Sequence, residues 1–189
     1  MDYVKINKKR VFITNDSLYI DNYQINQISE IKKLKRYPNL KGLFLENNKL
    51  TKIEGLDHLV NLNKLHLEGN SITEISGLNS LNKLEELELG GNQISKITHL
   101  DHLQNLKALV LNNNQLNKIN GLEKLVNLKS LDLSNNQIEE LDGIERLKNL
   151  EYLNLSNNNI KNKEKLTKLT KLQTLKLKGN PVENSSTKK

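Results

Sequence analysis

Three glutamates crowd one short segment of a chain that is basic overall. Residues 84–92 read LEELELGGN and contain Glu85, Glu86 and Glu88, while the formal net charge of the chain is +7. Neighbouring carboxylates act as general acid and base when a pocket excludes water and separates their pKa values. They serve equally well as an acidic surface that orients a basic partner. The direction in which each glutamate points decides between these two uses.

Other catalytic and metal-binding patterns are absent or weak. The chain has no cysteine, so it has no disulfide, thiolate nucleophile or cysteine-ligated metal. It also lacks P-loop, GxGxxG, HExxH and GxSxG motifs. His99 and His102 lie three residues apart in THLDHL, with His58 at a related position, but histidines on a solvated turn are usually surface residues. We therefore predict no enzyme, no cofactor and no metal site.

An internal repeat carries the glutamates. From Leu40 the pattern LxxLxLxxNxIxxIxGLxxLxx recurs every 22 residues, with the seventh unit starting at Leu172. The LxL alternation predicts a short strand with its leucines on one face. The apolar residues of the second half recur every three positions, which favours a 3₁₀ turn or a short helix. One such unit cannot bury its leucines alone, so the units must stack. The sequence predicts an α/β solenoid, a right-handed horseshoe with a concave parallel β-sheet and convex 3₁₀ or short-helix turns.

An asparagine occupies the ninth position of every unit. Its side chain offers both a carbonyl and an amide, which satisfy backbone groups where the chain turns inward after the strand. We expect a structural asparagine ladder with no binding role, made of Asn48, Asn70, Asn92, Asn114, Asn136, Asn158 and Asn180.

The repeat divides the chain into three parts. Residues 1–39 are expected to form an N-terminal cap with a hairpin and a degenerate repeat, in which Asp21 falls where a leucine belongs. Residues 40–171 hold six full repeats, and residues 172–189 hold a truncated repeat and a tail. Lys163 and Lys165 replace the usual Ile and Gly of the sixth unit, which predicts a looser convex side there.

The repeat also determines which way each glutamate side chain points. The third, fifth and seventh positions of each unit point away from the leucine core, toward the concave face, so Glu86 and Glu88 share that face while Glu85 lies at its edge. Lys64 should lie beside Glu86 and offset its charge. One alternative is a concave face that is simply solvated, but apolar and aromatic side chains beside acids favour a partner site. We predict that a Lys/Arg-rich protein surface binds Phe44, Glu46, His66, Glu68, Glu86, Glu88, Val110, Asp132 and Tyr152.

The chain resembles the leucine-rich repeat family from Leu40 to Val182. Phrases such as LTKIEGLDHLVNLNKLHLEGNSI are similar to the 22-residue subclass of the protein phosphatase 1 regulatory subunit. That resemblance implies protein binding through concave acidic and aromatic residues, here Phe44, Glu88 and Asp132 in one column, and a phosphatase-like enzyme as one partner class. The bacterial internalins also share 22-residue repeats and phrases like Asn92-Gln93-Ile94, but they usually have Pro where this chain has Gly, and they carry a leader.

Two alternative functions use other features. A polyanion such as nucleic acid or an anionic membrane would bind the lysine-rich stretch 161–178, although scarce arginine and the lack of interleaved aromatics disfavour nucleic acid. An exported adhesive repeat protein would need a leader, and the first residues, MDYVKINKKRVFITNDS, are too charged for a signal peptide. No stretch is apolar enough to span a membrane. We therefore expect a cytoplasmic, non-enzymatic binding scaffold.

Overall fold

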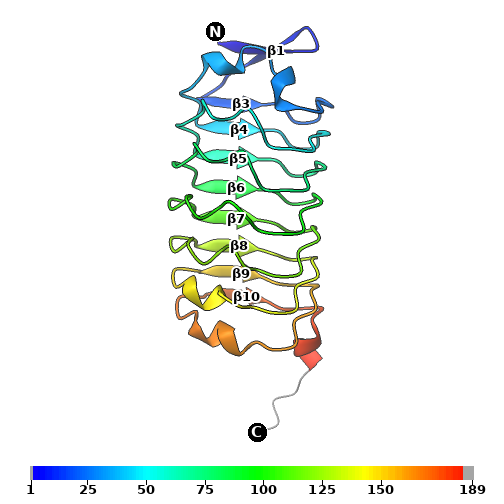
Figure 1. Ribbon diagram of the computed structural model, residues 1–189, viewed down its shortest axis with the longest axis vertical. Coiled ribbons are helices and arrows are strands. Elements are labelled where there is room, and N and C mark those ends of the chain that lie inside the picture. The colour runs from blue at the N-terminus through cyan, green and yellow to red at the C-terminus, as the bar shows by residue number, and fades with distance from the viewer. Residues whose placement is uncertain (1, 185–189) are drawn as a thin grey trace.

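The predicted solenoid is confirmed. The computed structural model describes residues 2–184, and its main sheet has eight parallel strands in the order β10-β9-β8-β7-β6-β5-β4-β3. Figure 1 shows them stacked as one ladder along the long axis. Their bounds are Ser17–Tyr19 (β3), Gly42–Phe44 (β4), Lys64–His66 (β5), Glu86–Glu88 (β6), Ala108–Val110 (β7), Ser130–Asp132 (β8), Tyr152–Asn154 (β9) and Thr174–Lys176 (β10). We call each turn of the solenoid a coil and name it by its strand.

The N-terminal end is covered by an antiparallel hairpin. Strands β1 (Tyr3–Ile6) and β2 (Lys9–Phe12) pair with each other, and Val4 and Ile6 are fully buried against the first coil. At the other end Leu175 of β10 is 40% exposed, whereas its equivalents in β4 to β9 are fully buried. The leucine core therefore opens to the surface at the C-terminal coil. Residues from 185 on, in the predicted tail, lie outside the described part.

The first coil is longer than the rest, which hid its strand from the 22-residue alignment. Ser17 pairs with Gly42, an offset of 25 residues, whereas Gly42 pairs with Lys64, an offset of 22. The residue that aligns with the strand leucine is therefore Leu18, three residues before Asp21. The additional three residues extend the convex side, where the β3 coil holds two 3₁₀ turns, η1 (Ile28–Glu30) and η2 (Leu34–Arg36).

The remaining convex segments are tight turns, and the named helical ones are all 3₁₀ turns. On the convex side they are η3 (Ile144–Arg146) and η4 (Glu164–Lys168), and η5 (Pro181–Asn184) directly follows the last ladder asparagine. Near Lys163 and Lys165, where the sequence predicts a looser convex side, the chain forms η4, the longest of these 3₁₀ turns. Leu166 is buried there, but Lys163 is exposed where the other repeats bury an Ile or Leu. None of the helices in residues 2–184 has the length and apolar character needed to cross a membrane.

The asparagine column links neighbouring coils through buried hydrogen bonds. Asn92, 7% exposed, is typical: its Nδ2 donates to the carbonyls of Leu67 in the coil before and Leu89 in its own coil, each at 3.0 Å. Its Oδ1 accepts the backbone N–H of Ile72 at 2.9 Å. Each such side chain satisfies buried backbone groups that no β-ladder reaches.

A second polar column, which the sequence analysis missed, borders the other end of the strands. Here Asn105 Nδ2 donates to the carbonyl of Asn82, and Asn127 and Asn149 repeat the contact on the carbonyls of Gln104 and Val126. These asparagines are more exposed than the ladder, because they lie where each coil returns from the convex side. The signal for them was present in the sequence as an Asn or Lys just before each repeat's first leucine.

Replacing a ladder asparagine should destabilise the fold strongly. In Asn92→Leu, the backbone groups of Ile72, Leu67 and Leu89 lose a buried partner, which should lower the free energy of unfolding by roughly 3–5 kcal/mol. Urea unfolding followed by circular dichroism measures this. The control Asn159→Leu changes an exposed asparagine and should stay within about 0.5 kcal/mol of wild type. Equal losses in both variants would contradict the role of the ladder.

Two convex glycines should respond differently to alanine. Both Gly55 and Gly77 have positive φ, +74° and +66°, so each alanine pays roughly 1 kcal/mol for the left-handed backbone. At Gly77 the new Cβ would lie 2.1 Å from the carbonyl oxygen of Ile53, whereas at Gly55 it would meet no atom within 4 Å. The overlap should cost Gly77→Ala a further 1–3 kcal/mol or so. Equal urea midpoints for the two variants would show that the coils can separate freely at Gly77.

Candidate functional site

The predicted binding residues fall on the concave face of the sheet, and the strands β4 to β6 bring six of them together. Phe44, His66 and Glu88 are lateral neighbours because β4, β5 and β6 pair in register. Glu46 and Glu68 follow at the ends of β4 and β5. We call Glu46, His66, Glu68, Glu86 and Glu88 the His66 cluster.

His66 is the centre of this cluster. Its Nε2 lies 3.0 Å from Glu86 Oε1, and its Nδ1 lies 3.4 Å from Glu46 Oε1 and 3.7 Å from Glu88 Oε2. The side chain of His66 is only 13% exposed. The contact of His66 with Glu46 is diagonal, so it is not found when only residues directly opposite each other are compared. Diagonal neighbours are also within reach of long side chains, and His66 contacts carboxylates on both adjacent strands in this way.

Lys64 and Glu86 form the expected ion pair on the same face. Lys64 Nζ is 2.7 Å from Glu86 Oε2. Partial burial opposes ionisation of Glu86, but the hydrogen bond and charge of Lys64, with those of His66, outweigh it and lower the pKa of Glu86. The hydrogen bond to Glu86 in turn raises the pKa of Lys64. This end of the cluster is therefore neutralised inside the protein.

Glu68 is the least compensated carboxyl group. Burial, then a carboxyl-to-carboxyl hydrogen bond with Glu88 and the charges of Glu88 and Glu46, raise the pKa of Glu68 to about 8. The Oε2 atom of Glu68 is shielded from solvent. With every carboxyl group of residues 2–184 ionised, it has no hydrogen-bond donor within reach. A proton on Glu68 supplies the missing donor. The cluster thus holds more negative charge than Lys64 and His66 can offset.

An aromatic pair that the sequence analysis missed borders the cluster. Tyr19 of β3 stacks on Phe44 with ring centroids 4.5 Å apart and planes at 11°, and Phe44 meets the His66 ring edge-to-face at 4.6 Å. Tyr19 is 51% exposed. The alternation of Leu18 and Ile20 was the available signal, but the 25-residue spacing of the first coil concealed it.

Of the other predicted residues, Val110 borders the cluster, whereas Asp132 and Tyr152 lie farther along the sheet. Asp132 accepts hydrogen bonds from the backbone N–H and hydroxyl of Ser134, at 2.9 and 2.6 Å, and from Asn154 at 3.0 Å. Tyr152 has the ammonium of Lys176 at 5.3 Å from its ring centroid. Val110 is the half-buried lateral neighbour of Glu88. Asp132 therefore has little free hydrogen-bonding capacity for a partner.

Two overlapping trios in the cluster have a spacing compatible with a cation. In Glu46–His66–Glu68 and in His66–Glu86–Glu88, the ligand atoms lie within 4.8 Å of one another. Imidazole with carboxylates is a donor set that divalent transition metals accept. The same atoms also suit an ammonium or guanidinium group from a partner. The two convex histidines, by contrast, bind backbone: His99 Nδ1 contacts the Ile75 carbonyl and His102 Nε2 that of Leu78, each at 2.9 Å.

The raised pKa of Glu68 gives stability a defined pH dependence. Between the ordinary glutamate pKa and about 8, the folded chain keeps a proton that the unfolded chain has lost, so stability falls as pH rises through this window. Glu68→Gln removes the ionisation but keeps a neutral donor. Its melting temperature should match wild type near pH 5 and exceed it increasingly at pH 7 and pH 9. A constant difference at all three pH values would contradict the assigned pKa shift.

Comparison with known proteins places this architecture in a family. A profile for leucine-rich repeats in two copies matches residues 60–102 and 104–146, and a second leucine-rich repeat profile matches residues 127–182. The search of curated proteins returned no significant match.

Several solved structures share the fold. The structure of internalin C2 from Listeria monocytogenes is 31% identical with a TM-score of 0.84, and the match covers 92% of this chain and 74% of that one. The internalin inlF of the same species is 28% identical with a TM-score of 0.80; 87% of this chain matches, but it spans only about half, 48%, of that chain. The ectodomain of the Arabidopsis thaliana receptor kinase GASSHO1/SCHENGEN3 is 31% identical with a TM-score of 0.67, over 79% of this chain and 20% of that one. The chain belongs to the leucine-rich repeat family.

Proposed function

We propose that this protein is a binding scaffold whose concave face docks a partner protein with a Lys/Arg-rich surface. The observation that carries the proposal is the His66 cluster, where four carboxyl groups gather around His66 and Lys64 beside the stacked rings of Tyr19 and Phe44. A partner cation would neutralise the remaining charge, and the aromatic pair would supply apolar contact. Leucine-rich repeats commonly mediate protein–protein interaction, which supports this use of the fold.

Binding suits this site better than catalysis. Glu86 is held in ion pairs with Lys64 and His66, and the pKa of Glu86 is lowered, so it is a poor proton donor at neutral pH. The cluster stands on the face of a sheet and presents a surface rather than a closed pocket. Ion pairs that are completed by a partner fit such a surface, because orientation and association rate depend on charge complementarity.

The partner class rests on the composition of one column. Phe44 and Glu88 lie in the column that the phosphatase regulatory subunit resemblance assigns to binding, which supports a phosphatase-like enzyme as a partner in the cytoplasm. The matched Arabidopsis thaliana ectodomain was solved in complex with Casparian strip integrity factor 2, so a related repeat array holds a partner in that case.

Two other functions have a specific observation in their favour. The exposed side chains of Lys161, Lys163, Lys168, Lys176 and Lys178 form a basic end that suits a polyanion. The likeness to the internalins supports an exported adhesive repeat protein, in which the same concave face would be used outside the cell. The polyanion-binding function differs from the scaffold function in the surface that binds. The adhesive function differs from it in the place where the protein acts.

Charge reversal on the concave face should abolish partner capture. Glu46→Lys/Glu88→Lys places two cations where the partner's cations would bind, so co-purification of a discrete protein from native lysate should fall at least about tenfold, since each close charge pair contributes 1.5 kcal/mol or more. Quantitative mass spectrometry of nuclease-treated eluates measures the loss.

The matched control moves the same charge to the convex side. Glu139→Lys/Glu140→Lys alters two exposed glutamates, and both double variants change the formal charge from +7 to +7 + 4 = +11. The control should retain capture, and both variants should give the wild-type circular dichroism spectrum. Equal losses in the two variants, or capture of nuclease-sensitive material alone, would favour the basic end as the binding surface.

A further inference from the structure

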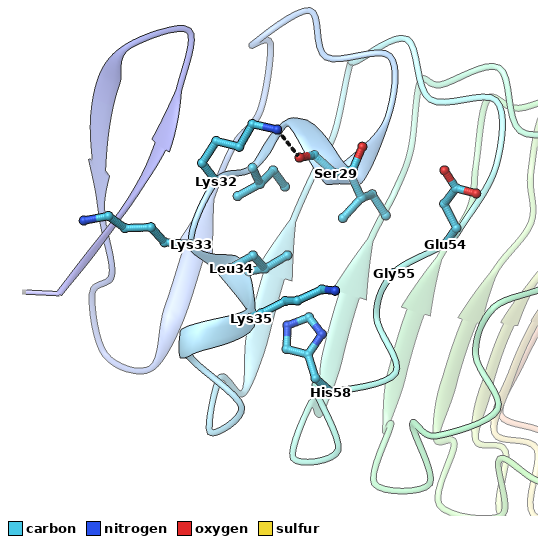
Figure 2. Close-up of a pocket in the computed structure, with 10 residues that line it drawn as sticks. Ser29, Lys32, Lys33, Leu34, Lys35, Glu54, Gly55 and His58 are labelled. Atoms are coloured by element: carbon cyan, nitrogen blue, oxygen red, sulfur yellow. Dashed lines mark hydrogen bonds between the residues drawn. The ribbon is translucent and has the colours of Figure 1, made fainter.

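A cavity of about 500 Å³ lies on the convex side between the β3 and β4 coils. Figure 2 shows it bounded by the segment from Ser29 to Lys35 on one side and by Glu54, Gly55 and His58 on the other. Its origin is the longer first coil. The convex segment of this coil is fastened to the hairpin, because Lys32 and Lys5 exchange two backbone hydrogen bonds of 3.0 and 2.8 Å. The first coil therefore departs from the path that later coils follow.

Gly55 shows the space that this departure leaves. In the β5 and β7 coils, a Cβ added at Gly77 or Gly121 would lie 2.1 or 2.3 Å from a carbonyl oxygen of the coil before. A Cβ added at Gly55 would have no atom within 4 Å. The backbone that packs against this turn elsewhere in the solenoid is displaced here.

His58 shows the hydrogen bond that is lost with it. His102, at the equivalent repeat position in the β6 coil, contacts the Leu78 carbonyl of the coil before through Nε2 at 2.9 Å. The Nε2 of His58 is shielded from solvent and has no hydrogen-bond partner among residues 2–184. A buried imidazole nitrogen without a partner costs free energy that a ligand with an acceptor would recover.

The walls of the cavity set the chemistry of such a ligand. Ile28, Ile31 and Leu34 form an apolar floor and are buried in the core. Lys33 points away, toward the hairpin, where its Nζ bonds the Tyr3 hydroxyl at 2.9 Å. Lys35 extends beside the His58 ring, and its ammonium makes no hydrogen bond or ion pair within residues 2–184.

Lys32 and Glu54 complete the rim. Lys32 Nζ donates to the Ser29 carbonyl at 3.1 Å, and Glu54 lies on the far side of the space from Lys32. The free positive charge of Lys35 and the free nitrogen of His58 therefore lie together at one end, over an apolar floor. That arrangement suits an anion with a short hydrocarbon body.

The geometry points to a binding site for a small branched carboxylic acid in this convex cavity. The carboxylate accepts a hydrogen bond from His58 Nε2, in the tautomer protonated there, and pairs with the Lys35 ammonium as the flexible lysine lifts from the ring. The hydrocarbon body covers Ile28, Ile31 and Leu34. A free acid and the C-terminal carboxylate of a peptide ending in leucine offer the same chemistry.

Titration of the ¹⁵N-labelled chain with 3-methylbutanoate tests the site. Amide shifts should saturate with a dissociation constant near 1 mM and should centre on Ser29, Lys35, Gly55 and His58. Lys35→Met should weaken binding at least about tenfold by removing the charged hydrogen bond. Its matched control, Lys33→Met, removes a lysine that points away and should leave binding within about twofold of wild type. N-acetyl-leucine distinguishes the sources: tighter binding than 3-methylbutanoate identifies a peptide C-terminus, and weaker binding a free acid.

Three results would overturn the site. One is the absence of saturable shifts at these residues, and another is equal binding of the neutral amide 3-methylbutanamide. The third is an equal loss of affinity in Lys35→Met and Lys33→Met. That result would show that the ligand responds to overall positive charge and not to a specific contact with Lys35. Lys35 is exposed, whereas Lys33 is half-buried and its Nζ bonds the Tyr3 hydroxyl of the hairpin. Unchanged amide spectra of the hairpin and of the β5 to β10 coils therefore check that both variants keep the fold.

Discussion

The buried side chain of the ladder asparagine is the interaction on which the rest of the structure depends. A coil with one three-residue strand cannot satisfy its own backbone groups where the chain turns inward. Each asparagine supplies the missing partners in its own coil and in the coil before, as Asn92 does with Leu89 and Leu67. Because the bonds are buried and cross between coils, neighbouring coils are held in one register. That register stacks the leucines into a continuous core.

The same register makes the concave face a surface on which side chains line up. Residues 22 apart become lateral neighbours, and residues on the diagonal come within reach. His66 can therefore contact carboxylates from the coils on both sides. The buried leucine core does not include these concave side chains, so their identities can vary while the core is kept. In the proposed function, a cation of the partner offsets the charges of Glu46 and Glu88, which lie beside Glu68 and raise its pKa.

Much of the fold could be predicted because its constraint is periodic. The LxL strands, the asparagine column and the ion pair of Lys64 with Glu86 all follow from a fixed spacing of 22. The misses occur where the spacing changes or where contacts run diagonally. Tyr19 was hidden by the 25-residue first coil, and the contact of Glu46 with His66 crosses between columns. The cavity beside Gly55 has the same origin, because it lies next to the first coil, which is three residues longer than the coils after it.

The proposed function places a basic partner on the concave acidic cluster and on no other face. The most direct measurement is an amide-shift titration of the ¹⁵N-labelled chain with a Lys/Arg-rich peptide, with a polyglutamate peptide as control. The basic peptide should shift the amide signals of residues 64–68 and 86–90, and the acidic peptide should leave them unchanged. Two results would contradict this placement. The basic peptide could shift amide signals spread over the convex acidic residues, or only polyglutamate could cause shifts, at residues 161–178.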